Sequence, residues 1–180
     1  MRRFLFVMTI FLALVTAKAF PVEAFFTPSR DCESVIIGAL EKAKDIVIAV
    51  YSISNPRIVA ALKMAKGRGA NLRILTHSLQ ASSRSSKIME LLTYGLNLRV
   101  NSHHKIMHNK FATFDDKVAI SGSYNWTTPA SEQNDENCLL IDEPKVVSAY
   151  KKNFENLWNL NAKENSDRKL SQIKETQKRK

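Results

Sequence analysis

A histidine and a lysine two residues apart are the side chains in this sequence best suited to phosphodiester chemistry. His108 and Lys110 begin a segment that ends at Asp115 and reads H-x-K-x4-D. Residues two apart in a β-strand project from the same face. The imidazole can then attack phosphorus while the ammonium neutralises a phosphate oxygen. His103 also begins an H-x-K pattern, but no aspartate completes it, so we expect His103 and His104 to be loop residues.

Asp115 completes the predicted catalytic pattern but should act indirectly. It lies five residues beyond Lys110, which puts it off the shared face of His108 and Lys110 in a regular strand. Aspartate is also a common turn former. We therefore expect Asp115 to organise structure around the site without touching the substrate.

Further polar side chains follow downstream. Ser123 and Asn125, within Gly-Ser-Tyr-Asn, can share a face and donate hydrogen bonds to phosphate oxygens. Glu136 precedes an apolar run, and its carboxylate could orient the histidine by accepting a hydrogen bond from the other ring nitrogen. Asp135 could do the same, Glu132 is a weaker candidate, and spacing does not choose among them.

Two aromatic residues beside this motif have two interpretations. Tyr124 and Trp126 could stack on a base or lie against a lipid chain. Alternatively, at least one of them belongs to the core.

The first nineteen residues have the pattern of a secretory leader. A positive start is followed by a run at residues 4–15 that is apolar except for Thr9, and then by a small-x-small site ending at Ala19. The run is short for a transmembrane helix, so an uncleaved anchor is the minor alternative. We expect residues 1–19 to be a signal peptide, cleaved after Ala19 or Ala24, and the protein to be periplasmic or secreted without a stable membrane span.

The chain is basic, which favours a polyanionic partner. Its 180 residues carry a net charge of +10, and removing residues 1–19 takes away three basic residues and leaves +7. Such a charge attracts nucleic acid or an anionic membrane. Seven basic residues lie in the segment 161–180, which has little apolar pattern and is predicted to be a disordered tail or a frayed helix. Cys32 and Cys138 could form one disulfide or remain two buried thiols.

The remaining pattern predicts one α/β domain, residues 25–160, with a mixed, mostly parallel β-sheet flanked by helices. Strand, helix and strand follow one another at residues 45–51, 55–67 and 71–76, which implies a parallel pair with a crossover helix. The other predicted helices span residues 34–44, 85–94 and 144–158. The other predicted strands span residues 96–100, 110–114, 118–121 and 138–141, with a hairpin turn at Asp115-Asp116.

Together these motifs resemble the phospholipase D superfamily, and most of all its small, exported, single-motif bacterial endonucleases. The resemblance runs from about residue 25 to residue 158. It implies a metal-independent, two-step mechanism in which one histidine forms a phosphohistidine and a second handles the protons. Because the chain holds one copy of the motif, it implies a homodimer with His108 of each chain in a shared site at the twofold axis. Lys110, Ser123 and Asn125 would hold phosphate, and Glu136 would orient His108.

Three functions fit these features. The first is a phosphodiesterase acting on DNA or RNA with little sequence preference. The alternative is a phospholipase D that hydrolyses phosphatidyl lipids and could act as a secreted virulence factor. The second alternative is a nucleic-acid-binding module without catalysis, which the complete set of His108, Lys110, Asn125 and Glu136 disfavours.

Overall fold

The computed structural model describes residues 22–178, so the predicted leader and its cleavage site at Ala19 lie outside the described residues. One seven-stranded sheet runs through the domain in the order β1-β7-β6-β5-β2-β3-β4. The strands are β1 (Val22–Phe26), β2 (Asp45–Val50), β3 (Asn71–Thr76), β4 (Asn97–Val100), β5 (Lys110–Phe114), β6 (Val118–Gly122) and β7 (Asn137–Ile141). The helices are α1 (Asp31–Lys42), α2 (Pro56–Gly67), α3 (Ser78–Ala81), α4 (Ile88–Thr93), α5 (Thr128–Glu132), α6 (Pro144–Leu160) and α7 (Lys163–Lys178).

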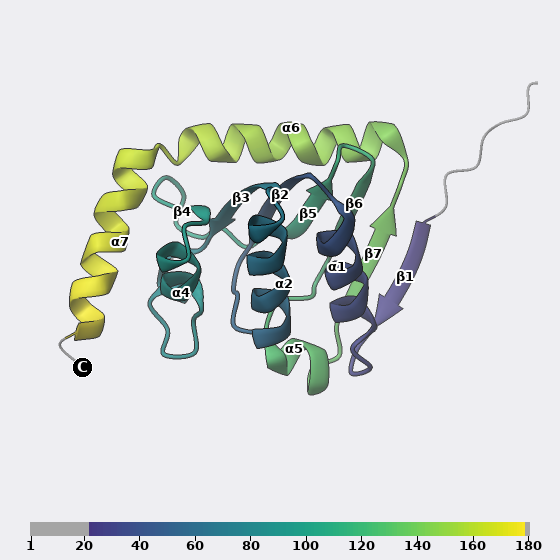
Figure 1. The fold of residues 1–180 in the computed structure, drawn as a ribbon, viewed down its shortest axis with the longest axis horizontal. Helices are drawn as coiled ribbons and strands as arrows, with labels where there is room; N and C mark the ends of the chain where they lie inside the picture. The colour runs from purple at the N-terminus through teal and green to yellow at the C-terminus, as the bar shows by residue number, and fades with distance from the viewer. Residues whose placement is uncertain (1–21, 179–180) are drawn as a thin grey trace, which may run out of the picture.

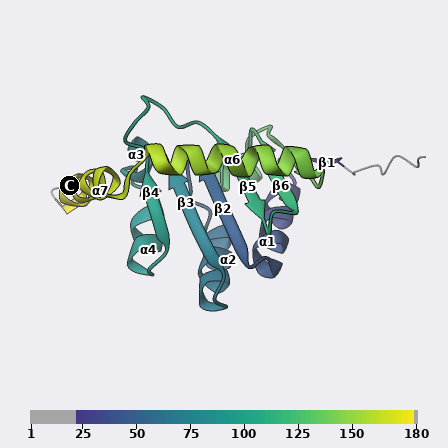
Figure 2. The same cartoon turned by 90° about the horizontal axis from the view of Figure 1, so that it is seen from above.

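Helices cover both faces of the sheet. Alternate residues of β2 face opposite sides: Ile46, Ile48 and Val50 pack with α1, α2 and α4, whereas Val47 and Ala49 pack with α6. Figure 1 shows α1, α2 and α4 beside one another and α6 running across the strands, and Figure 2 shows α6 crossing over the sheet. β2 is therefore buried on both sides, as its continuous apolar sequence predicts.

The predicted α/β class and the mixed sheet are confirmed, but the sheet is not mostly parallel. Of the strand pairs within residues 22–178, β2–β3 and β3–β4 are parallel, whereas β2–β5, β5–β6, β6–β7 and β1–β7 are antiparallel. The tight turn between β5 and β6 can only reverse the chain, and the longer connection from β6 to β7, which contains α5, returns β7 antiparallel as well. Between β5 and β6, Asp115 and Asp116 both have positive φ, 52° and 53°, which a two-residue hairpin turn requires.

Strand β1 extends the domain beyond its predicted start at residue 25. Val22 lies opposite Ile141 and Phe26 opposite Asn137, so β1 forms the edge of the sheet beside β7. Removal of residues 1–24 would leave only two residues of this strand, whereas cleavage after Ala19 would keep it whole. The sequence did not predict β1 because its partner lies more than a hundred residues away.

In the predicted tail, the described residues 161–178 are largely helical and docked, so of the two predicted states a helix is the one found. Residues 163–178 form α7, which packs against β4 at the end of the sheet (Figure 1). Leu170 is buried, Ile173 packs against the core, and the Ser166 hydroxyl accepts a hydrogen bond from the backbone N–H of Val100 at 2.9 Å. These few contacts suffice because α7 covers an edge strand, which needs a partner for its backbone.

A disulfide joins Cys32 in the first turn of α1 to Cys138 in β7, which decides between the two interpretations of these cysteines. The bond ties two elements that are 106 positions apart in the sequence. Among the helices of residues 22–178, none is both long enough and apolar enough to cross a membrane.

Candidate active site

All the predicted site residues except Asp115 lie on one side of the domain, where the ends of several strands meet. β5 runs antiparallel to β2, with Lys110 opposite Val50, so the start of β5 lies at the end of β2. β7 runs antiparallel to β6, with Cys138 opposite Gly122, so residue 123 lies opposite residue 137, the neighbour of Glu136. His108, Lys110, Ser123 and Glu136 therefore reach the same edge although they belong to different strands and loops.

His108 and Lys110 are brought together as their spacing predicted. The Lys110 Nζ lies 3.0 Å from each ring nitrogen of exposed His108 and 2.8 Å from its carbonyl oxygen. Burial lowers the pKa of Lys110, an effect that the nearby Glu136 carboxylate opposes. The ammonium is thus held next to the imidazole in a partly desolvated place, where its attraction for an anion is stronger than in water.

Ser123 and Asn125 follow β6 in a loop bound to the start of β7. The Ser123 N–H donates to the Asn137 carbonyl, and the Asn137 N–H donates to the Ser123 hydroxyl, both at 3.1 Å. This close approach explains the glycine before Ser123, since a Cβ on Gly122 would lie 2.8 Å from the Cα of Cys138. The Asn125 Oδ1 is buried and accepts no hydrogen bond within the described part of the chain.

Glu136 lies close enough to Lys110 for its negative charge to act on the pKa of the lysine. Among the described residues, its carboxylate bonds to Asn134 and not to His108. Its Oε1 accepts from the Asn134 side chain at 3.1 Å, and its backbone N–H donates to Thr27 at 2.9 Å. Of its two competitors, Glu132 pairs with Arg30 away from His108, and Asp135 is exposed.

Asp115 follows the far end of β5, on the opposite side of the domain from Lys110. It comes five positions after Lys110 in the sequence, about 16 Å along an extended chain. Its Oδ1 accepts from the backbone N–H groups of Lys44 and Asp45, both at 2.8 Å, which holds the β5–β6 turn against the start of β2. This matches an organising role and excludes direct contact with a substrate at His108.

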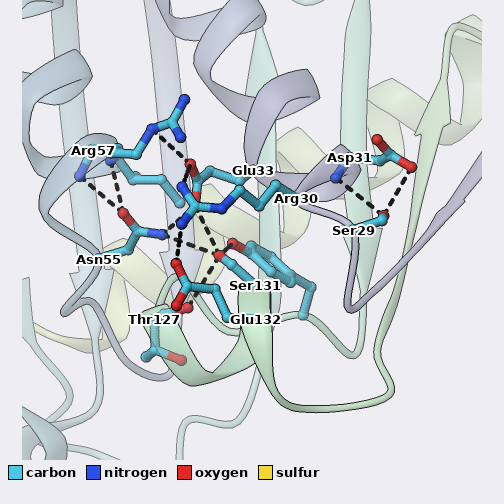
Figure 3. A network of polar contacts seen from close by, with 11 residues as sticks. Ser29, Arg30, Asp31, Glu33, Asn55, Arg57, Thr127, Ser131 and Glu132 are labelled. Atoms are coloured by element: carbon cyan, nitrogen blue, oxygen red, sulfur yellow. Dashed lines mark hydrogen bonds and ion pairs between the residues drawn. The ribbon is translucent and has the colours of Figure 1, made fainter.

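A buried polar network around Glu33 (Figure 3) is joined to the Ser123–Asn125 loop through the Tyr124 hydroxyl. Glu33 is buried and accepts from Asn55 at 2.6 Å and from Ser131 at 2.9 Å, and it pairs with Arg57 at 2.9 Å. The Ser131 hydroxyl is also 2.5 Å from the Tyr124 hydroxyl. Burial raises the pKa of Tyr124 to about 12, so its hydroxyl stays protonated.

Neither aromatic residue of this loop is free to stack on a substrate. Tyr124 and Trp126 are both buried in the core. Their role is to anchor the loop, because the Trp126 carbonyl accepts from the backbone N–H groups of Ser54 and Asn55.

Two residues that the sequence analysis did not single out, Tyr51 and His77, stack beside His108 and Lys110, with only Tyr51 in direct contact with the pair. The Tyr51 ring meets the His108 ring edge to face at a centroid distance of 4.6 Å, and Lys110 Nζ lies 5.2 Å from the Tyr51 centroid. On the other side His77 stacks on Tyr51 at 5.1 Å. Their only sequence signal is their position at strand ends: Tyr51 is the last residue of the predicted strand 45–51, and His77 directly follows the predicted strand 71–76.

The arrangement can bind and attack a phosphate group. The exposed His108 imidazole provides a nucleophile, and the adjacent Lys110 ammonium provides a cation for the phosphate oxygens. Within residues 22–178, no three His, Cys, Asp or Glu side chains gather as a group that could hold a metal ion.

Comparison with known proteins identifies this arrangement. Residues 36–158 match the family described as "Cardiolipin synthase, PLD-like domain". The chain is 29% identical over 148 residues to the mitochondrial cardiolipin hydrolase of Xenopus laevis, covering 76% of this chain and 70% of that protein. It is 34% identical over 134 residues to the phospholipase D of Rickettsia prowazekii, covering 74% of this chain and 65% of that protein.

The fold also resembles a solved bacterial structure. Nuc from Salmonella typhimurium, described as a phospholipase D family member, aligns with a TM-score of 0.74 and 27% identity, over 80% of this chain and 97% of Nuc. The family match covers more than half of the sequence and includes every predicted site residue. The chain therefore belongs to the phospholipase D-like family of phosphodiester hydrolases.

Proposed function

We propose that this chain hydrolyses phosphodiesters through a covalent phosphohistidine at His108, and that its substrate is DNA or RNA. The observation that carries the proposal is the exposed His108 imidazole with the Lys110 ammonium 3.0 Å away. A ring nitrogen attacks phosphorus, the bond to the leaving oxygen breaks, and Lys110 compensates the phosphoryl charge. Water then attacks phosphorus, and the bond to the imidazole breaks.

A second histidine has to give a proton to the leaving alkoxide and later take one from water. His77 is near but buried behind the Tyr51 ring, which keeps it from a substrate at His108. We therefore propose that His108 of the partner subunit supplies this group in a homodimer with one shared site.

Nucleic acid is favoured by charge near the site. The basic helix α7 packs at the same end of the sheet as His77, and Lys169 on it donates to the backbone of Asn101 at 3.1 Å. The basic residues of α7 add positive charge at this end of the domain, and positive charge attracts a polyanion of extended length.

A phospholipid is the second candidate, and exposed apolar residues favour it. Leu79 follows β3 and Ile106 precedes His108, and their exposed fractions are 70% and 56%. Both lie on connections at the edge of the sheet that carries the site. Apolar side chains at such a rim could enter the surface of a bilayer.

The test offers the purified mature protein plasmid DNA, RNA and phosphatidylcholine vesicles in the presence of EDTA, with His108→Ala as the control. We expect cleavage of nucleic acid that His108→Ala abolishes. Release of headgroup from vesicles without nucleic acid cleavage would establish the lipid substrate instead.

The covalent step needs its own experiment. Substrate labelled at phosphorus is mixed with the enzyme and quenched during turnover, and the label is then located by peptide mapping. We expect an acid-labile adduct on the peptide that contains His108. A label on another residue, or tight nucleic acid binding by a protein without turnover, would refute the mechanism.

A further inference from the structure

A buried histidine lies behind the catalytic residues. His77 follows β3, is 2% exposed, and its Nδ1 is 2.8 Å from the Asn101 Oδ1. That oxygen also accepts from the Ser78 N–H at 2.9 Å, while the other end of the Asn101 amide donates to the His104 carbonyl at 2.7 Å. The amide oxygen therefore faces His77, and the 2.8 Å contact is a hydrogen bond to it when Nδ1 carries the proton; the Met107 backbone N–H lies 3.5 Å from the same nitrogen.

The His77 ring supports the ring that touches the nucleophile. His77 and Tyr51 are stacked at 5.1 Å with an interplanar angle of 15°, and Tyr51 meets His108 at 4.6 Å with an angle of 66°. Lys110 also lies over the Tyr51 ring. Tyr51 is thus held between His77 on one side and the catalytic pair on the other, and its hydroxyl accepts from Gln80 at 3.0 Å.

Helix α7 holds this arrangement from outside. The family match ends at residue 158, so α7 lies beyond it. Lys169 donates to the Asn101 carbonyl at 3.1 Å, and Ser166 accepts from the N–H of Val100 at 2.9 Å. These bonds fix the end of β4, and with it the amide that orients His77.

We propose that His77 is a positioning residue for His108, acting through the Tyr51 ring and itself oriented by Asn101. The proposal rests on His108 being the nucleophile proposed above. A residue needed only to fill the core would be apolar, because burying an imidazole is costly unless its polar atoms are bonded. Here the bond fixes the plane of the ring, and the plane of the ring fixes Tyr51.

The experiment compares full-length mature His77→Ala and His77→Phe with exposed His103→Ala as a matched control. The substrate is bis(p-nitrophenyl) phosphate, which is too small to need an extended binding surface. We expect His77→Ala to lower kcat about tenfold with KM changed by less than about twofold, because misplacing a reacting group costs rate and not binding. His77→Phe keeps a stacked ring and should recover part of kcat, and His103→Ala should leave it unchanged.

A second readout reports on His108 directly. The ring-proton NMR signal of His108, assigned with His108→Gln, feels the Tyr51 ring current and should move in His77→Ala more than in His77→Phe. Unchanged kcat and an unchanged His108 signal in folded His77→Ala would overturn the proposal. If His77→Ala does not fold, His77→Phe and Asn101→Ala decide by the same criteria. If the wild-type protein does not turn over, the proposed function fails, while the His108 signal still tests the positioning.

Discussion

Lys110 is the cation placed next to the proposed nucleophile, His108. Its ammonium lies against both His108 and the Tyr51 ring, and burial lowers its pKa below the ordinary value of 10.5. An approaching phosphate would draw the ammonium toward its oxygens. Glu136 opposes the fall in pKa and helps keep Lys110 charged.

Replacing Lys110 by Gln should lower kcat/KM by about 10²- to 10³-fold, because a charged contact to the phosphoryl oxygens is lost. Lys110→Arg should retain part of the activity. Since the pKa of Lys110 is lowered, wild-type activity should decline on the alkaline side before the ordinary lysine range, and Lys110→Arg should move this decline to higher pH. The measurement is kcat/KM against pH. Lys117→Gln, in the distant hairpin, is the control, and an equal loss there would contradict the prediction.

His77 should make stability sensitive to mild acid. Burial, above all, lowers its pKa below 6.5; the positive charges of Lys169 and His108 act in the same direction, and the Asn101 bond opposes them. The folded state thus favours neutral His77, so its contribution is complete above pH 6.5 and is lost as pH falls through the lowered pKa. As pH falls from 6.5 through the lowered pKa, the free energy of unfolding measured with urea should decrease less for His77→Phe than for wild type. Equal losses would show that other groups cause the acid sensitivity.

At the scale of elements, each strand end delivers one part of the site. The ends of β2 and β3 supply Tyr51 and His77, the start of β5 supplies Lys110, and the connection from β6 to β7 supplies the polar loop and Glu136. α7 covers β4, the strand farthest from β1. The local signals predicted most of these elements: Asn55 caps α2 by accepting from the N–H of Arg57 at 2.9 Å, and Pro56 begins the helix.

The contact of α7 with the domain should depend on its buried leucine. Leu170→Ala removes a side chain that is 7% exposed and should lower the free energy of unfolding by about 2–4 kcal/mol. The matched control is Ser171→Ala at the next position of the same helix, where the residue is exposed; it should change this free energy by less than about 0.5 kcal/mol. Urea denaturation measures both. Equal stabilities of the two variants would mean that α7 is not docked in solution.

At the scale of the whole molecule, the disulfide connects α1 to β7, the strand bonded to the Ser123–Asn125 loop. Cys138 follows Glu136 and Asn137, so the bond fixes the start of β7 as well as the helix. Removing it by Cys32→Ser with Cys138→Ser should lower the free energy of unfolding by about 2–5 kcal/mol. Reductant should destabilise the wild type toward the double variant and leave the variant unaffected. A wild type indifferent to reductant would show that the bond does not form in solution.

The proposed homodimer makes a quantitative prediction about mixed chains. If each site needs His108 from both subunits, wild-type protein re-equilibrated with His108→Ala forms mixed dimers without a complete site. Activity should then fall as the square of the wild-type fraction. A linear fall, or an active enzyme that sediments as a monomer, would refute the shared site.

The sequence alone determined the local features of this protein. Two-residue spacing placed His108 and Lys110 together, the apolar run at residues 45–51 predicted a central strand, and paired aspartates predicted the β5–β6 turn. These follow from strand periodicity and from backbone conformations, which neighbouring residues decide.

Only the tertiary structure decided which distant residues meet. It paired β1 with β7, joined Cys32 to Cys138, docked α7 on β4, and placed His77 behind Tyr51. It also moved Asp115 to the far edge of the sheet, although Asp115 is only five residues from Lys110. The physical reason is that an extended strand separates residues that are close in the sequence, whereas sheet pairing brings together residues that no local pattern connects.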